Sequence, residues 1–164
     1  MTSGPRRLLA IVGPGEGAAL DDIAAAERVA ELAVRAGWAV SCGGRAAGVM
    51  AAAARGAARG GGLAIGLLSS SDTETAALDL SVALATGLGE ARNAVLAQSC
   101  TAMVVCGMNP GTAAEVALAL KAGKFVALIR PAPVVRAFFQ ALAPELVQCA
   151  DSADAALAAL TTSS

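Results

Sequence analysis

The stretch Thr86-Gly87-Leu88-Gly89-Glu90-Ala91-Arg92-Asn93 decides the fold, together with Gly111-Thr112-Ala113-Ala114-Glu115 further along the chain. Each segment lies beside an apolar run typical of a buried strand, and each opens a run with helical periodicity. A strand, a turn of small residues and a helix form the arrangement by which α/β proteins present backbone N–H groups to an anion. The two segments therefore predict an α/β fold with a ligand site at the ends of its strands.

Short apolar runs alternate with helical patterns along the rest of the chain. Strands are predicted at 8–12, 38–42, 63–68, 81–85, 102–106, 125–129 and 146–149, and helices at 20–36, 47–58, 89–99, 112–122, 134–142 and 152–160. This alternation predicts a three-layer, Rossmann-like domain with a mainly parallel sheet. We expect residues 1–164 to form a single domain, with its ligand at the carboxyl ends of the strands near a topological switch point.

Composition and charge exclude several classes of function. The chain is 56% hydrophobic and 2% aromatic with a formal net charge of -1, so it offers nucleic acid neither a basic field nor a stacking surface. The apolar run after Arg6-Arg7 is too short for a signal peptide, and no apolar stretch approaches the roughly 18 residues of a membrane span. We expect a cytoplasmic protein without nucleic-acid or membrane partners. The apolar, Ala-rich helices carry few charges and favour a homo-oligomer.

The chain contains four cysteines and no histidine. No C-x-x-C spacing occurs, so we expect neither a disulfide framework nor a metal site. Any acid–base chemistry must use carboxylates, Arg, Lys, Cys or the ligand, because the side chain that normally titrates near neutral pH is absent. Cys42 and Cys106 end strands at the ligand edge, and their interpretation as small core residues is favoured over contact with a ligand or metal.

Glycines gather at the predicted ligand edge. The residues expected to line the ligand site are Gly13, Gly43, Gly44, Gly87, Arg92, Asn93, Gly107, Gly111 and Thr112. Gly13-Pro14-Gly15-Glu16-Gly17-Ala18 matches the dinucleotide fingerprint G-x-G-x-x-A, but Pro14 lacks an N–H and the second strand ends in Ser41-Cys42 rather than an acid. A tight turn, or a turn that contacts another ligand, is therefore favoured over NAD or FAD binding.

Other polar residues near this edge fit structural roles at least as well. Arg45 and Arg55 could reach the ligand edge, but their interpretation as solvated helix residues is favoured, and Glu90 is interpreted as an acid that complements a helix dipole. The polar run at 69–75 is either a mobile lid or a plain solvated connection, and the second interpretation is favoured.

An ordered set of motifs gives a more specific indication. Cys42-Gly43-Gly44, Gly48-Val49-Met50, Ala54-Arg55-Gly56-Ala57 and the Gly-rich run at 61–66 occur in that order before the two segments quoted first. With them, residues 8–130 resemble the family once named possible lysine decarboxylases. That family contains the Lonely Guy phosphoribohydrolases and the molybdenum cofactor carrier proteins. The run Gly-Leu-Gly-Glu-Ala-Arg-Asn resembles the carrier branch more closely.

The resemblance implies an oligomeric, Rossmann-like protein that binds a phosphorylated nucleotide or a pterin phosphate. The expected ligand is thus the molybdenum cofactor or a nucleoside monophosphate. In the hydrolase branch an Arg paired with a Glu supports cleavage of an N-glycosidic bond, and Arg92 and Glu115 are the matching positions. A carboxylate stabilises oxocarbenium charge, and a guanidinium anchors phosphate. An arginine near a helix start opposes the helix dipole, so a purely structural role for Arg92 is disfavoured. Glu115 lies in the expected first turn, where an acid complements the dipole, so it fits a structural role as well as a functional one.

The chain departs from the hydrolase pattern P-G-G-x-G-T-x-E-E. Gly107-Met108-Asn109-Pro110 replaces the consecutive glycines, Ala114 replaces the first glutamate, and Asn93 stands in place of a lysine that follows the arginine. These changes favour binding without turnover, that is, a carrier or sensor. A nucleoside 5′-monophosphate hydrolase is the enzyme alternative, and an assembly component that has lost its ligand is the third hypothesis.

Overall fold

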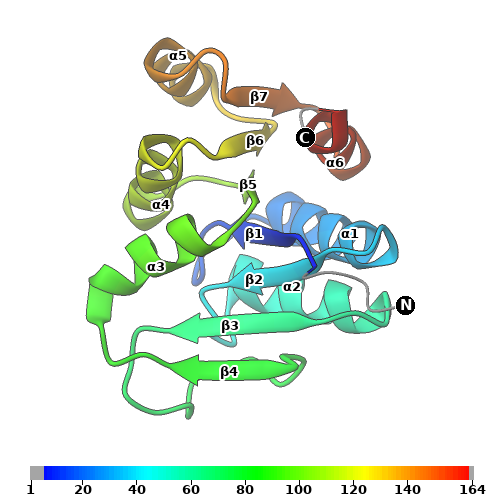
Figure 1. Ribbon diagram of the computed structural model, residues 1–164, viewed down its shortest axis with the longest axis vertical. Helices are drawn as coiled ribbons and strands as arrows, with labels where there is room; N and C mark the ends of the chain where they lie inside the picture. Colours follow the sequence, from blue (N-terminus) through cyan, green and yellow to red (C-terminus); the bar gives the residue numbers. More distant parts are fainter. Residues whose placement is uncertain (1–5, 163–164) are drawn as a thin grey trace.

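The computed structural model describes residues 6–162 as a single sheet covered by helices on both faces (Figure 1). The strands are β1 (Leu8–Val12), β2 (Ala39–Cys42), β3 (Ala64–Leu68), β4 (Val82–Ala85), β5 (Ala102–Cys106), β6 (Phe125–Ile129) and β7 (Val147–Ala150). The α-helices are α1 (Leu20–Arg35), α2 (Gly48–Arg59), α3 (Arg92–Ser99), α4 (Pro110–Lys121), α5 (Pro133–Leu142) and α6 (Ala153–Thr162), and a 3-10 turn, η1, covers Gly89–Ala91.

The sheet has the order β4-β3-β2-β1-β5-β6-β7, and every neighbouring pair is parallel. The chain leaves β1 toward β2 on one side and returns to pair β5 with β1 on the other, so the topological switch point lies between β1 and β5. This topology confirms the predicted three-layer α/β fold.

Helices α1, α2 and α6 cover one face of the sheet, and α3, α4 and α5 cover the other (Figure 1). Alternate residues of each central strand enter the two cores: Leu9 and Ile11 face α1 and α2, whereas Ala10 and Val12 face α3 and α4. Strands buried on both faces give continuous apolar runs in the sequence, which is why their positions were predictable. No helix within residues 6–162 is long and apolar enough to cross a bilayer.

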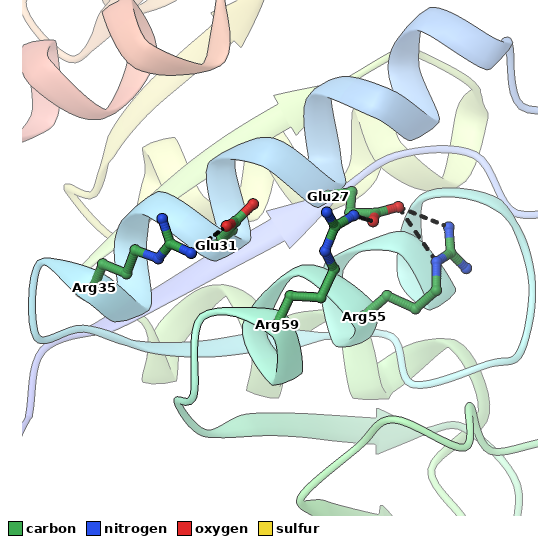
Figure 2. Close-up of polar contacts among 5 residues, drawn as sticks. All are labelled: Glu27, Glu31, Arg35, Arg55 and Arg59. Atoms are coloured by element: carbon green, nitrogen blue, oxygen red, sulfur yellow. Dashed lines mark hydrogen bonds and ion pairs between the residues drawn. The ribbon is translucent and has the colours of Figure 1, made fainter.

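Helices α1 and α2 pack closely and are joined by an ion-pair network (Figure 2). A Cβ at Gly56 would overlap the carbonyl oxygen of Glu27, so the two backbones meet where a side chain has no room. The Glu27 carboxylate accepts hydrogen bonds from Arg55 at 3.3 Å and from Arg59 at 2.5 Å. Partial burial raises the pKa of Glu27, but the two guanidinium groups outweigh it and hold the pKa below its usual value. Arg55 thus has a structural partner.

Two helix boundaries differ from the predicted ones. The helix expected at 89–99 begins as η1 and becomes α-helical only at Arg92, because Gly87 and Gly89 adopt positive φ angles of 63° and 55° that a right-handed helix does not accommodate. The helix expected at 112–122 begins at Pro110, where proline suits the first helical position. The Asn109 side chain caps it by accepting the Thr112 N–H at 2.8 Å.

The polar run at 69–75 is held by backbone hydrogen bonds. Gly87 and Gly89 donate to the carbonyl oxygens of Ser70 and Ser69 at 2.8 and 3.0 Å, and Ala46 donates to Thr75 at 2.8 Å. These contacts tie both ends of the run to neighbouring segments, an arrangement that suits a fixed connection better than a mobile lid.

Candidate functional site

A polar crevice of about 250 Å³ lies at the carboxyl ends of β1, β2 and β5, beside the switch point. Six residues that the sequence analysis selected line it: Gly13, Arg92, Asn93, Gly111, Thr112 and Glu115. Six further lining residues are Gly15, Glu16, Arg45, Met50, Ser69 and Asn109. Its position is the one that ligands take in open α/β sheets.

Two glycines allow the close packing around the crevice. A Cβ at Gly13 would lie 2.7 Å from Cγ2 of Val49 and would overlap the carbonyl oxygen of Cys106, so only glycine lets the turn after β1 approach the end of β5. A Cβ at Gly43 would lie 2.5 Å from Nη1 of Arg92. Gly43 therefore supports the site by leaving space for the arginine side chain.

Arg92 and Glu115 meet in the crevice from opposite elements. Arg92 begins α3, and its Nη1 lies 3.9 Å from Oε1 of Glu115 on α4, with side-chain exposures of 14% and 10%. Because α4 starts at Pro110, Glu115 lies in its second turn rather than the first. The expected alternative role of Glu115 as an acid complementing the helix dipole is therefore wrong, since that effect is confined to the first turn.

The Arg92 guanidinium is incompletely paired. Its Nε and Nη1 atoms are buried and have no hydrogen-bond partner, and the contact with Glu115 is longer than a hydrogen bond. A buried donor without an acceptor costs about 1–3 kcal/mol, so such groups in native proteins call for an explanation. An anionic ligand in the crevice would supply the missing acceptors.

The charge of the crevice depends on pH. Burial raises the pKa of Glu115 to about 7, although Arg92 opposes this shift. A backbone hydrogen bond and the Arg45 guanidinium, which pairs with Glu16, hold the pKa of Glu16 below its usual value. Below pH 7 the crevice therefore combines two cationic arginines, an ionised Glu16 and a mostly neutral Glu115. This balance favours an anion.

The N-terminus of α4 offers fewer N–H donors than the sequence suggested. Thr112 donates its N–H to Oδ1 of Asn109, Ala113 donates to the Asn109 carbonyl oxygen at 2.9 Å, and Pro110 has no N–H. Among the first residues of this helix, only Gly111 keeps its N–H available within the described part of the chain. The Arg92 side chain is consequently the principal anion donor.

Three of the glycines that the sequence analysis assigned to the ligand site lie outside the crevice. Gly44, with φ of 82°, lies against Gly66, and a Cβ there would be 3.0 Å from the Gly66 Cα. Gly87 lies against the connection after β3, where it donates its N–H to the carbonyl oxygen of Ser70. Gly107 lines a neighbouring cavity rather than the crevice.

The two strand-end cysteines lie in the core. Cys42 and Cys106 are fully buried, and burial raises the pKa values of their thiols to about 11 and about 12. Both thiols are therefore protonated at neutral pH, as expected of structural residues.

Sequence reasoning did not select several of the crevice residues. For Arg45 a solvated helix position was favoured over a place at the ligand edge, whereas the structure puts it in the crevice and pairs it with Glu16, a residue distant in sequence. Asn109 had a readable signal, since an Asn-Pro pair before an apolar run is typical of an N-cap followed by the first helical residue. The sequence around Met50 and Ser69 contained no comparable signal.

A family model described as the SLOG cluster4 family matches residues 6–157. An uncharacterized protein of Archaeoglobus fulgidus is 40% identical over 111 residues, which span 67% of this chain and 71% of that protein. The structure of the molybdenum cofactor binding protein from the phototrophic bacterium Rippkaea orientalis is similar, with a TM-score of 0.94, 34% identity and 98% of each chain covered. The molybdenum cofactor carrier protein of Chlamydomonas reinhardtii gives a TM-score of 0.90 at 36% identity, over 97% of this chain and 98% of that one.

Proposed function

This chain belongs to the SLOG cluster4 family, and we propose that it binds and carries a phosphorylated ligand, either a pterin-type molybdenum cofactor or a nucleotide. The ligand occupies the crevice at the switch point and is released unchanged. Similarity over nearly the full length of two molybdenum cofactor proteins supports a carrier role. The observation that carries the proposal is the buried, unpartnered Nε and Nη1 of Arg92 in that crevice.

The donor set suits a phosphate group on such a ligand. A guanidinium offers paired N–H groups in the geometry that phosphate oxygens accept, and Gly43 leaves the space that the Arg92 guanidinium occupies. Because Gly13 has no side chain, the turn that lines the crevice packs against the end of β5. Glu115, partly protonated near neutral pH, can donate a hydrogen bond to a ring or sugar oxygen as well as accept one.

Three features favour binding over hydrolysis. Ala114 stands where the hydrolase pattern has the first of its two glutamates, so one carboxylate of the pair is missing. The Glu16 carboxylate forms an ion pair with Arg45. Stabilising an oxocarbenium ion requires a charged carboxylate, whereas a pKa of about 7 leaves Glu115 only partly ionised near neutral pH. The phosphoribohydrolase alternative therefore predicts an activity that this arrangement supports poorly.

The apolar surface and the cysteines bear on the oligomeric state and the cellular compartment of the protein. We expect residues 1–164 to act as one domain that self-associates, because Val82 and Leu84 on edge strand β4 and Val95 on α3 are apolar and exposed. The four free cysteines suit a reducing compartment such as the cytoplasm.

Native mass spectrometry of freshly purified protein, followed by incubation with adenosine monophosphate, tests the proposal. We expect a co-purified phosphorylated small molecule, and no release of free adenine above the uncatalysed rate. Robust adenine release that is lost in Glu115→Gln, while the nucleotide still binds, would replace the carrier proposal with the hydrolase.

A further inference from the structure

A second cavity, of about 260 Å³, lies beyond the crevice at the carboxyl ends of β5 and β6. The first turn of α1 contributes Asp22 to it, and the segment after β6 contributes Arg130. Its remaining walls are mainly apolar and include Met108, Leu128 and Val135. The Gly107-Met108 turn belongs to this cavity, whereas Asn109, the next residue, lines the crevice, so the two spaces are neighbours with separate linings.

The Asp22 carboxylate faces the cavity without a hydrogen-bond partner. A Cβ at Gly107 would lie 2.5 Å from Oδ2 of Asp22, so glycine at this position leaves room for the carboxylate. Within residues 6–162 the carboxylate accepts no hydrogen bond, although it is partly buried beside the Arg130 charge. Its oxygens are therefore available to a donor placed in the cavity.

Arg130, which follows β6, holds an unusual backbone conformation. Its φ of 45° is left-handed, and it is the one non-glycine residue of the described chain with a positive φ. Its N–H donates to Ala150 at 2.8 Å, and its Nη2 donates to the carbonyl oxygen of Asp21 at 2.9 Å. These bonds fix the guanidinium beside the start of α1, where its other N–H groups can reach a ligand. Strained backbone conformations of this kind persist where the surroundings fix them, often at ligand sites.

Size and lining restrict what the cavity can hold. Its volume lies just below the roughly 300–1,000 Å³ of pockets that hold drug-sized ligands, so it suits one ring system rather than a whole nucleotide. Apolar walls suit the faces of a planar ring, and a methionine sulfur such as that of Met108 is a favourable neighbour for an aromatic edge. Asp22 and Arg130 are placed to form hydrogen bonds with the polar edge of such a ring.

We propose that this cavity binds a planar ring through a 2-amino-4-oxopyrimidine edge. Asp22 accepts the exocyclic amino group and the adjacent ring N–H, and Arg130 donates to the carbonyl oxygen. A carboxylate accepts two parallel N–H donors, and arginine commonly donates to such a carbonyl. Pterins and guanines share this edge. The choice of a pterin probe rests on the proposed function, whereas the cavity and its charged pair do not.

Calorimetric titration of the full chain with pterin, 9-methylguanine and lumazine tests the proposal. Lumazine carries an oxo group where pterin carries the 2-amino group. We expect pterin or 9-methylguanine to bind at least tenfold more tightly than lumazine, and the tighter of the two identifies the natural ring. Equal binding of lumazine, or no binding of either amino ring, would overturn the proposal.

Substitutions separate this site from the crevice. Asp22→Asn should weaken binding of the amino ring at least tenfold and abolish the preference over lumazine, whereas Asp79→Asn, at an exposed position outside the cavity, should leave both unchanged. Thermal melts of the two variants establish that they are folded, and Arg130→Gln should weaken binding of the amino ring independently. Unchanged affinity in Asp22→Asn and Arg130→Gln would overturn the assignment.

Titration with inorganic phosphate measures binding at the crevice separately. Arg92→Ala should weaken phosphate binding and leave pterin binding intact, and loss of pterin binding in that variant would overturn the separate site. If phosphate fails to bind the wild-type protein while pterin binds through Asp22, the proposed crevice function fails and the second site stands.

Discussion

Replacing Glu115 with glutamine is expected to stabilise the protein at alkaline pH. Burial raises the pKa of Glu115 from 4.5 to about 7, against the influence of Arg92. Since a pKa difference of one is worth about 1.4 kcal/mol, ionising this buried carboxyl costs the folded state about 3 kcal/mol relative to the unfolded chain. Glutamine keeps the shape and hydrogen-bonding capacity of the neutral acid and avoids this cost.

The pH window follows from the direction of the shift. Below about pH 4.5 the carboxyl is protonated in both states, and its contribution to stability is complete. As the pH rises, the unfolded chain releases the proton first, so stability falls until the folded carboxyl has also ionised, just above pH 7. The variant should therefore match the wild type near pH 4.5 and exceed it by about 3 kcal/mol above pH 8.

Urea unfolding of both proteins between about pH 4.5 and pH 9 measures this gap as a difference in free energy of unfolding. Glu27→Gln is a suitable control because the pKa of Glu27 is lowered, so its carboxylate contributes fully to stability above the unfolded value of 4.5, and the loss in that variant should not grow through the neutral and alkaline range. A gap for Glu115→Gln that does not grow with pH, or a variant less stable than the wild type at alkaline pH, would refute the reasoning.

Three further outcomes are expected. Glu27→Gln should lose about 1 kcal/mol of stability, and the loss should shrink at high salt, because the ion pairs joining α1 to α2 are partly exposed; a salt-independent loss in urea unfolding would contradict this. Gly43→Ala should weaken phosphate binding in calorimetry, because its Cβ would lie 2.5 Å from Nη1 of Arg92 and displace it; unchanged affinity would place the anion elsewhere. Light scattering at micromolar concentration should give a mass above the 15.9 kDa of one chain, and a mass near that value would count against self-association.

The fold was largely predictable because its signals are local. Buried strands such as β1 and β5 appear as short, continuous apolar runs, and the glycines that end them mark the ligand edge. The start of α4 was misplaced because Asn109-Pro110 was compared with a glycine-rich family motif, although it is also a helix-capping pair. Local propensity contained the answer there.

The site was only partly predictable because its electrostatics depend on tertiary contacts. The pairing of Arg92 with Glu115 was expected from the family resemblance, but the pKa of Glu115 depends on burial, which no local pattern encodes. The pairing of Arg45 with Glu16 joins different turns of the chain. The second cavity unites Asp22 with Arg130 from distant segments, and neither residue stands out in the sequence.

The central claim is that Arg92 anchors a phosphorylated ligand in the crevice. Calorimetric titration of the wild type, Arg92→Ala and Arg55→Ala with molybdenum cofactor and with adenosine monophosphate tests it most directly, since Arg55 carries the same charge outside the crevice. The wild type should bind at least one ligand, Arg92→Ala should lose about 1.5–3 kcal/mol of that binding free energy, the range for a hydrogen bond to a charged group, and Arg55→Ala should retain it. Binding that is equal in wild type and Arg92→Ala, or absent for both ligands, would contradict the claim.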